Sequence, residues 1–141
     1  MTGRTFLDTN VLVYAFDGAN RAKQVRAQEI LEAAIEDGQA MTSTQVLAEF
    51  YVTVVRKLDA PLTEVEAERA VRSPAMLPVV QHDPPLVLTA IASSRRYRIS
   101  LWDALIIESA RIGGCHRVLT EDLQDGGEYD GLVVENPFKG L

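Results

Sequence analysis

Short apolar runs alternate along the chain with longer segments in which apolar residues recur every three or four positions. The short runs are typical of buried strands, and the longer period is typical of amphipathic helices. This alternation favours an α/β protein whose mostly parallel sheet is covered by helices on both faces. The expected strands are residues 5–7, 40–42, 77–81, 117–120 and 132–134, and the expected helices are residues 11–16, 21–37, 44–58, 64–72, 84–98 and 102–112.

Local signals mark where several of these helices begin and end. Gly38 is suited to the left-handed conformation that ends a helix, and Thr63 and Glu66 have the spacing of a capping box. Asp83 precedes two prolines, which are tolerated in the first turn of a helix. Residues 102–112 are apolar almost all round, and this pattern predicts a buried helix.

Length and composition indicate the number of domains and argue against membrane proteins and zinc-binding proteins. A chain of 141 residues, 47% hydrophobic and free of linkers or repeats, predicts one domain over residues 1–141. The apolar run at residues 11–16 is too short to span a bilayer, and Asp8 interrupts any signal-peptide pattern, so a cytoplasmic protein without a membrane segment is expected. One cysteine and two histidines are too few for a structural zinc site, so any metal must be bound by oxygen.

The charge balance argues against a protein that binds nucleic acid over its whole surface. Twenty acidic and fourteen basic residues give a net charge of -6. A local basic patch is still compatible with this balance, and Arg95, Arg96 and Arg98 form one at the end of a predicted helix. These arginines are either cations that complement the helix dipole or phosphate-binding residues.

Two acidic residues directly follow predicted strands. Asp8 ends the first strand and Asp122 follows the strand at residues 117–120. Ligands of open α/β sheets bind beyond the carboxyl ends of the strands, so the two carboxylates are expected at the same edge. Taken singly, Asp8 is equally accounted for as a helix cap and Asp122 as a turn residue.

Two further acidic residues lie on predicted helices. Asp103 aligns with the apolar stripe of its helix, where a carboxylate needs compensation, although a capping box with Ser100 also explains it. Glu49 lies nearly opposite the apolar stripe of residues 44–58, and a solvated helix face is its obvious interpretation. Periodicity alone would therefore not select Glu49 as a functional residue.

Together these segments resemble the PIN-domain ribonucleases, and especially the toxins of VapBC-type toxin–antitoxin pairs. The similarity covers nearly the whole chain, and the joint order and spacing of its motifs form a stronger signal than any single motif. The motifs are the acidic segment at residues 6–15, Glu49 in the helix after the second strand, residues 100–106, residues 119–126, and Asn136-Pro137-Phe138 near the end.

The resemblance implies a set of site residues and partners. Asp8, Glu49, Asp103 and Asp122 correspond to an acidic quartet in which the three aspartates bind Mg²⁺ or Mn²⁺. The implied polar neighbours are Thr9, Asn10, Ser100 and Thr120, and Asp125 is a candidate outer ligand of the metal. It also implies a five-stranded sheet in the order 3-2-1-4-5, an RNA substrate, an antitoxin that inserts a segment into the active-site groove, and a homodimer.

The chemistry of RNA hydrolysis is consistent with such a quartet. Carboxylate oxygens suit hard divalent ions, which generate a nucleophile and offset charge on the phosphate. A haloacid-dehalogenase-like phosphatase would need Asp where this chain has Asn10, and a receiver domain would need a paired acid and a suitably placed lysine. The alternative that stays open is a non-catalytic PIN-like domain that binds RNA or protein.

Overall fold

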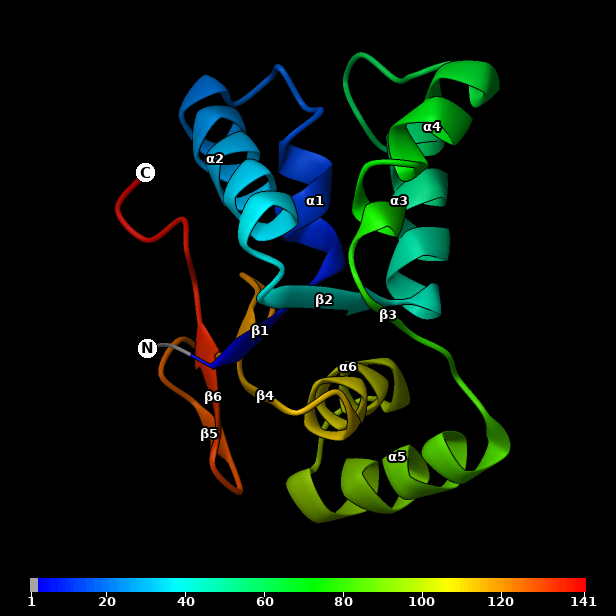
Figure 1. Cartoon of the computed structure of the whole chain (residues 1–141), viewed down its shortest axis with the longest axis vertical. Coiled ribbons are helices and arrows are strands. Elements are labelled where there is room, and N and C mark those ends of the chain that lie inside the picture. Colours follow the sequence, from blue (N-terminus) through cyan, green and yellow to red (C-terminus); the bar gives the residue numbers. More distant parts are fainter. Residues whose placement is uncertain (1–2) are drawn as a thin grey trace.

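The computed structural model describes residues 3–141 as one six-stranded sheet with helices packed around it (Figure 1). The spatial order of the strands is β3-β2-β1-β4-β6-β5. No helix in the described part of the chain is both long and apolar enough to cross a membrane. The strands are β1 (Arg4–Leu7), β2 (Ala40–Ser43), β3 (Val79–Val80), β4 (Cys115–Leu119), β5 (Glu128–Tyr129) and β6 (Leu132–Glu135).

Parallel pairing places β1 at the centre of the sheet. β1 pairs with β2 on one side and with β4 on the other, and β4 then pairs in parallel with β6. Leu7 at the end of β1 is in register with Leu119 at the end of β4. The residues that follow these two strands therefore emerge side by side, as the sequence predicted.

The sheet differs from the expected five strands at one edge. β5 is an additional short strand that pairs antiparallel with β6, and Gly131 occupies the turn between them with a φ of 90°. A two-residue strand carries too little periodicity to be recognised in a sequence. The five expected strands keep the predicted order, because the expected fifth strand corresponds to β6.

Helices lie above and below the central strands in the view of Figure 1. The first four helices form the upper group, in which α1 contacts α2 and α3, and α3 contacts α4. In the lower group α6 packs on β2 and β4, and α5 packs on α6. The bounds are α1 (Thr9–Tyr14), α2 (Arg21–Asp37), α3 (Thr44–Arg56), α4 (Glu64–Val71), the 3-10 turn η1 (Pro74–Met76), α5 (Pro84–Tyr97) and α6 (Leu101–Ile112).

The core forms where these helices meet the sheet. Phe6 and Leu12 from the first strand and helix, Phe50 from α3 and Ile107 from α6 are fully buried in one cluster. Burial of each such side chain contributes about 1.5–3 kcal/mol. A smaller cluster around Ala104 fills the contact between α5 and α6. The core thus fixes β1, α3 and α6 relative to one another.

The expected elements form, but several of their boundaries differ by a few residues. α1 and α3 end at Tyr14 and Arg56 rather than at residues 16 and 58, and β4 is Cys115–Leu119 rather than residues 117–120. α1 begins at Thr9 rather than residue 11, because Asp8 itself caps the helix. The third strand shrinks to Val79–Val80, since Pro78 has no N–H for the sheet and offers only its carbonyl, to the backbone of Thr42. α6, which was expected to be buried all round, is buried over residues 104–110, but Trp102 in its first turn is 62% exposed.

Candidate active site

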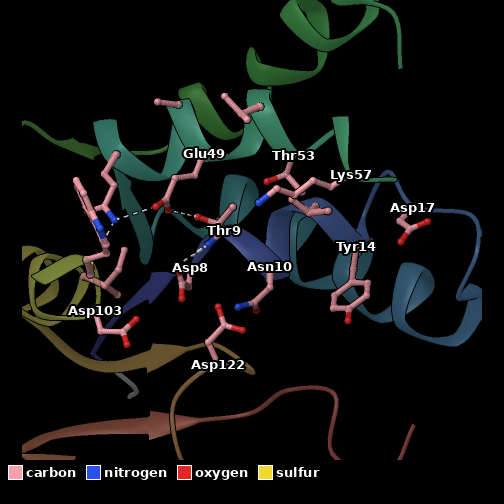
Figure 2. Close-up of a pocket in the computed structure, with 16 residues that line it drawn as sticks. Asp8, Thr9, Asn10, Tyr14, Asp17, Glu49, Thr53, Lys57, Asp103 and Asp122 are labelled. Atoms are coloured by element: carbon pink, nitrogen blue, oxygen red, sulfur yellow. Dashed lines mark hydrogen bonds between the residues drawn. The ribbon is translucent and has the colours of Figure 1, made fainter. Parts of the chain in front are cut away.

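A cavity of about 620 Å³ opens at the carboxyl ends of β1 and β4 (Figure 2). The four acidic residues singled out in the sequence all line it, although they come from four different parts of the chain. The complete lining is Asp8, Thr9, Asn10, Val13, Tyr14, Asp17, Gln45, Ala48, Glu49, Val52, Thr53, Lys57, Trp102, Asp103, Ile106 and Asp122.

Asp8 is the most buried of the four acidic residues in the cavity. Its side chain is 5% exposed, and its Oδ1 accepts a hydrogen bond from the backbone N–H of Thr9 at 2.7 Å. Burial raises the pKa of the Asp8 carboxyl from the ordinary 3.8 to about 6, and the charges of Asp122 and Glu49 push in the same direction against the hydrogen bonds that Asp8 accepts. Asp8 is therefore both a helix cap and a buried carboxylate held at an energetic cost.

The buried hydroxyl of Thr120 connects several residues of the site. It donates to Oδ2 of Asp8 at 2.8 Å and accepts from the side-chain amide of Asn10 at 3.0 Å. The backbone N–H of Asp122 donates to the same oxygen at 3.1 Å. Asn10 in turn accepts from the backbone N–H of Glu121 at 3.2 Å. One hydroxyl thus ties the loop after β4 to the start of α1.

Glu49 reaches the cavity from α3, although its place in the helical period predicted a solvated face. The Thr9 hydroxyl donates to Glu49 Oε1 at 2.8 Å, and the Gln45 amide donates to Oε2 at 3.1 Å. α1 packs against α3, so the polar side of α3 faces the polar start of α1 rather than open solvent. This contact between two helices is not visible in the period of either one.

Asp103 and Asp122 complete the acidic group from the other side of the cavity (Figure 2). Asp103 lies in the first turn of α6, where its backbone N–H donates to the capping hydroxyl of Ser100 at 3.1 Å. Partial burial raises the pKa of the Asp103 carboxyl, and the charges of Asp122 and Glu49 add to this effect. The helix cap and the cavity-facing carboxylate of Asp103 therefore coexist.

The donor set of the cavity fits a hard divalent cation. Its acidic end offers only carboxylate, hydroxyl and amide oxygens, which Mg²⁺ and Mn²⁺ prefer. The burial of Asp8 and Asp103, and the repulsion that Asp122 and Glu49 exert on each of them, are costs that a bound cation would offset. Among residues 3–141 no three His, Cys, Asp or Glu residues are gathered tightly enough to mark a metal site by geometry alone. The fit therefore rests on the chemistry of the donors and on their electrostatic strain.

Several residues expected near the site have other contacts. Asp125 accepts from the backbone N–H of Asn136 at 2.8 Å and pairs with Lys139 at 3.2 Å, outside the cavity lining. Arg96 pairs with Asp130 at 2.7 Å, and neither it nor the other two arginines at the end of α5 lines the cavity. Roles for Asp125 in metal binding and for Arg95, Arg96 and Arg98 in RNA binding stay predictions.

The structure adds cavity residues that the sequence did not single out. Tyr14, Asp17 and Lys57 line the end opposite Asp103 in Figure 2, and Trp102 also contributes to the lining. Tyr14 and Trp102 belong to the quoted sequence motifs, but both were counted there as parts of apolar helices. Only their exposure toward the cavity, which depends on helix packing, distinguishes them from core residues.

A second polar cluster anchors the loop that carries Asp122. Lys23 on α2 pairs with Glu121 at 2.9 Å and lies 4.7 Å from the centre of the Tyr14 ring. The Tyr14 hydroxyl also hydrogen-bonds to Glu121. The pKa of Tyr14 is raised by burial and by the neighbouring carboxylate, which keeps the hydroxyl protonated and able to donate. α1 and α2 therefore hold Glu121, and with it the backbone next to Asp122.

Comparison with known families decides where the chain belongs. The sequence model of the PIN-domain family matches residues 5–124 of this chain, and this range contains all four acidic residues of the cavity. The chain belongs to the PIN-domain family. A comparison of this PIN domain with curated proteins finds no significant match.

Solved structures share the PIN fold at low sequence identity. A toxin–antitoxin complex from Klebsiella pneumoniae is 21% identical with a TM-score of 0.70, over 95% of this chain and 98% of that one. VapBC2 from Rickettsia felis, bound to a promoter DNA fragment, is 17% identical with a TM-score of 0.66, over 94% and 97% of the two chains. VapC20 from Mycobacterium tuberculosis, a toxin that cleaves the sarcin–ricin loop, is 20% identical with a TM-score of 0.66, over 84% and 89%. At these identities the comparisons establish the fold of this PIN domain.

Proposed function

We propose that this PIN domain is a metal-dependent endoribonuclease and the toxin of a toxin–antitoxin pair. The observation that carries the proposal is the meeting of Asp8, Glu49, Asp103 and Asp122 in one cavity at the carboxyl ends of β1 and β4. PIN-domain nucleases typically use a divalent metal, which agrees with the oxygen donors of this cavity.

Each carboxylate has a distinct role in the proposed reaction. Asp8, Asp103 and Asp122 would hold Mg²⁺ or Mn²⁺, with Asp8 fixed by its two hydrogen bonds. Such an ion would make a water nucleophilic at neutral pH and would offset negative charge on the phosphate and the leaving oxygen. Glu49 orients the attacking water and accepts its proton, since its carboxylate is held at the cavity wall by Thr9 and Gln45.

The products follow from an in-line attack of water on phosphorus. The water oxygen forms a bond to phosphorus, and the bond from phosphorus to the 3′ oxygen of the preceding ribose breaks. The departing oxygen takes up a proton, so one fragment ends in a 3′-hydroxyl and the other begins with a 5′-phosphate. No covalent bond to the protein forms at any stage.

The toxin assignment is supported by the kind of protein that shares this fold. Two of the similar structures come from toxin–antitoxin systems and a third is a toxin that cleaves RNA. By extension, the partners of this chain are an RNA substrate, a cognate antitoxin that covers the cavity, and a second copy of the chain.

Incubation of the purified protein with end-labelled single-stranded RNA tests the activity. Cleavage is expected with Mg²⁺ or Mn²⁺ and should stop when EDTA is added, and a 5′-phosphate-dependent exonuclease should degrade the downstream fragment. RNA that stays intact under all metal conditions, although the protein binds it, would favour a non-catalytic PIN domain.

Removal of the Thr120 hydroxyl should disturb both stability and activity. Thr120→Val leaves partners of this buried oxygen unsatisfied, so we expect a loss of about 1–3 kcal/mol in the free energy of unfolding. Cleavage should fall by about 10–100-fold, because the hydroxyl orients Asp8 and the backbone of Asp122. Denaturant unfolding and initial cleavage rates measure the two effects.

Thr42→Val is the matched control for this variant. Thr42 is also fully buried, but its hydroxyl donates to the backbone carbonyl of Leu7 at 3.1 Å and does not line the cavity. This variant should lose stability and keep its cleavage rate under conditions in which it is folded. Equal losses of rate in the two variants would show that Thr120 acts only through stability.

A further inference from the structure

The cavity extends well beyond the four carboxylates. Beyond the acidic group in Figure 2, Thr53 and Lys57 from α3 face Tyr14 from α1, and Asp17 lies at the far end. Asp103 marks the opposite end, and the neighbouring Trp102 belongs to the same lining. A substrate held at the carboxylates would therefore reach different side chains in each direction.

Trp102 provides an open aromatic surface at one end of the cavity. Its side chain is 62% exposed, whereas residues 104–110 of the same helix are buried. It follows Leu101 at the start of α6, and the capping of this helix by Ser100 fixes its backbone. Unpaired bases stack on exposed aromatic rings irrespective of sequence, and this stacking requires a base that is free of a duplex.

Lys57 provides the only positive charge among the side chains that line the cavity within residues 3–141. It caps the carboxyl end of α3, and its backbone N–H donates to Thr53 at 2.8 Å, so the base of the side chain is fixed. Its amino end points toward the acidic residues in Figure 2. Because five carboxylates in the same lining repel a phosphate chain, a single cation decides where such a chain can lie.

Gln45 adds a hydrogen-bonding group between these features. Its amide nitrogen lies 3.1 Å from Glu49 and 3.5 Å from the carbonyl oxygen of Trp102. Its Oε1 atom is buried and has no hydrogen-bond partner within the described residues. A buried acceptor without a partner is unfavourable, so this part of the wall between Glu49 and Trp102 is polar and not fully satisfied.

We propose that single-stranded RNA crosses the cavity between Trp102 and Lys57. A base on one side of the scissile phosphodiester stacks on Trp102, and a phosphate on the other side binds Lys57. The proposal deepens the ribonuclease function and rests on it for the position of the scissile bond. It assigns Trp102 and Lys57 as the residues that position the strand on the two sides of the scissile bond.

The chain contains one tryptophan, so tryptophan emission, excited at a wavelength that tyrosine does not absorb, reports on this position alone. The probe is a hexameric oligoribonucleotide added to the Asp8→Asn variant in Mg²⁺. This variant is used because it should bind RNA without cleaving it. Stacking should quench the tryptophan emission with single-stranded RNA and not with a blunt RNA duplex. Trp102→Ala should weaken binding by about tenfold, and Trp102→Phe should restore most of it.

The salt dependence of binding tests Lys57 separately. In the same Asp8→Asn background, Lys57→Met should reduce the slope of log affinity against log salt by about 0.7, which corresponds to one phosphate of a single strand. Arg56→Met is the matched control, because Arg56 is the neighbouring exposed cation on α3 but does not line the cavity. Its slope should equal that of the parent.

The outcomes separate this proposal from the ribonuclease assignment. Quenching and a Lys57-dependent slope would support the RNA path even if the wild-type protein fails to cleave, since the assay needs no turnover. Cleavage by the wild type, together with unquenched fluorescence on bound RNA and full affinity in Trp102→Ala, would overturn the path and leave the nuclease intact. Equal slopes for Lys57→Met and Arg56→Met would also overturn it, because Lys57 would then contact no phosphate.

Discussion

Replacement of Asp8 or Asp103 by asparagine should lower RNA cleavage by more than about a hundredfold and leave the protein folded. Asparagine keeps the volume of each side chain but removes the charge that would hold the cation. The loss should appear in the rate at saturating RNA, because both residues lie at the acidic end of the cavity. Single-turnover cleavage with excess enzyme measures it.

Asp17→Asn is the control for general electrostatic effects. Asp17 also lines the cavity but lies at the opposite end in Figure 2, where it accepts a hydrogen bond from the backbone N–H of Ala19 at 3.0 Å. This variant should cleave RNA at a rate within a few-fold of wild type. A loss as large as that of Asp8→Asn would mean that total negative charge, and not a specific metal site, determines activity.

In EDTA, the wild-type protein should lose stability relative to Asp8→Asn as the pH rises from about 4 to about 6. The folded-state pKa of Asp8 lies above its ordinary 3.8, so in this range the folded state binds more protons than the unfolded state. Stability therefore decreases with rising pH until the carboxyl is ionised in both states. The full pKa difference corresponds to about 3 kcal/mol. Urea unfolding of both proteins at a series of pH values measures the change.

Added Mn²⁺ should reverse this disadvantage at pH 7. A ligand that binds only the folded state stabilises it by about 2.7 kcal/mol at a hundredfold excess over its dissociation constant. Wild type should gain this stability, and Asp8→Asn should gain much less. A parallel pH dependence of the two proteins in EDTA would show that burial of the ionised Asp8 carboxyl does not destabilise the fold. Equal gains from Mn²⁺ would show that Asp8 does not bind the ion.

Most of the fold could be predicted from the sequence, because strands and helices leave local or periodic signals in it. Apolar runs located the strands, and end signals located several helices, as Gly38 after α2 and the Thr63 and Asp83 caps illustrate. The residues after β1 and β4 could be placed together because neighbouring parallel strands share a carboxyl edge. The two-residue β5 left no periodic signal and could not be predicted.

The candidate site was only partly accessible to the same reasoning. Asp8 and Asp103 gave physical signals of their own, whereas Glu49 entered through the family resemblance. Its position in the cavity depends on the contact between α1 and α3, which no single helix period encodes. Trp102 illustrates the opposite case, since a tryptophan in an apolar helix indicated a core residue and the packing left it exposed.

The hydrogen bond from Thr120 to Asp8 joins residues 112 positions apart, and this separation has a consequence for the order of events during folding. Contacts between distant segments form slowly, because the intervening chain must first be brought together. A fragment that ends before β4 contains Asp8, Glu49 and Asp103, but it lacks the strand that seats Thr120 and Asp122. Under the proposed nuclease function, a chain in which β4 has not yet paired with β1 should therefore be unable to cleave RNA, and activity should begin only when this last central strand is in place.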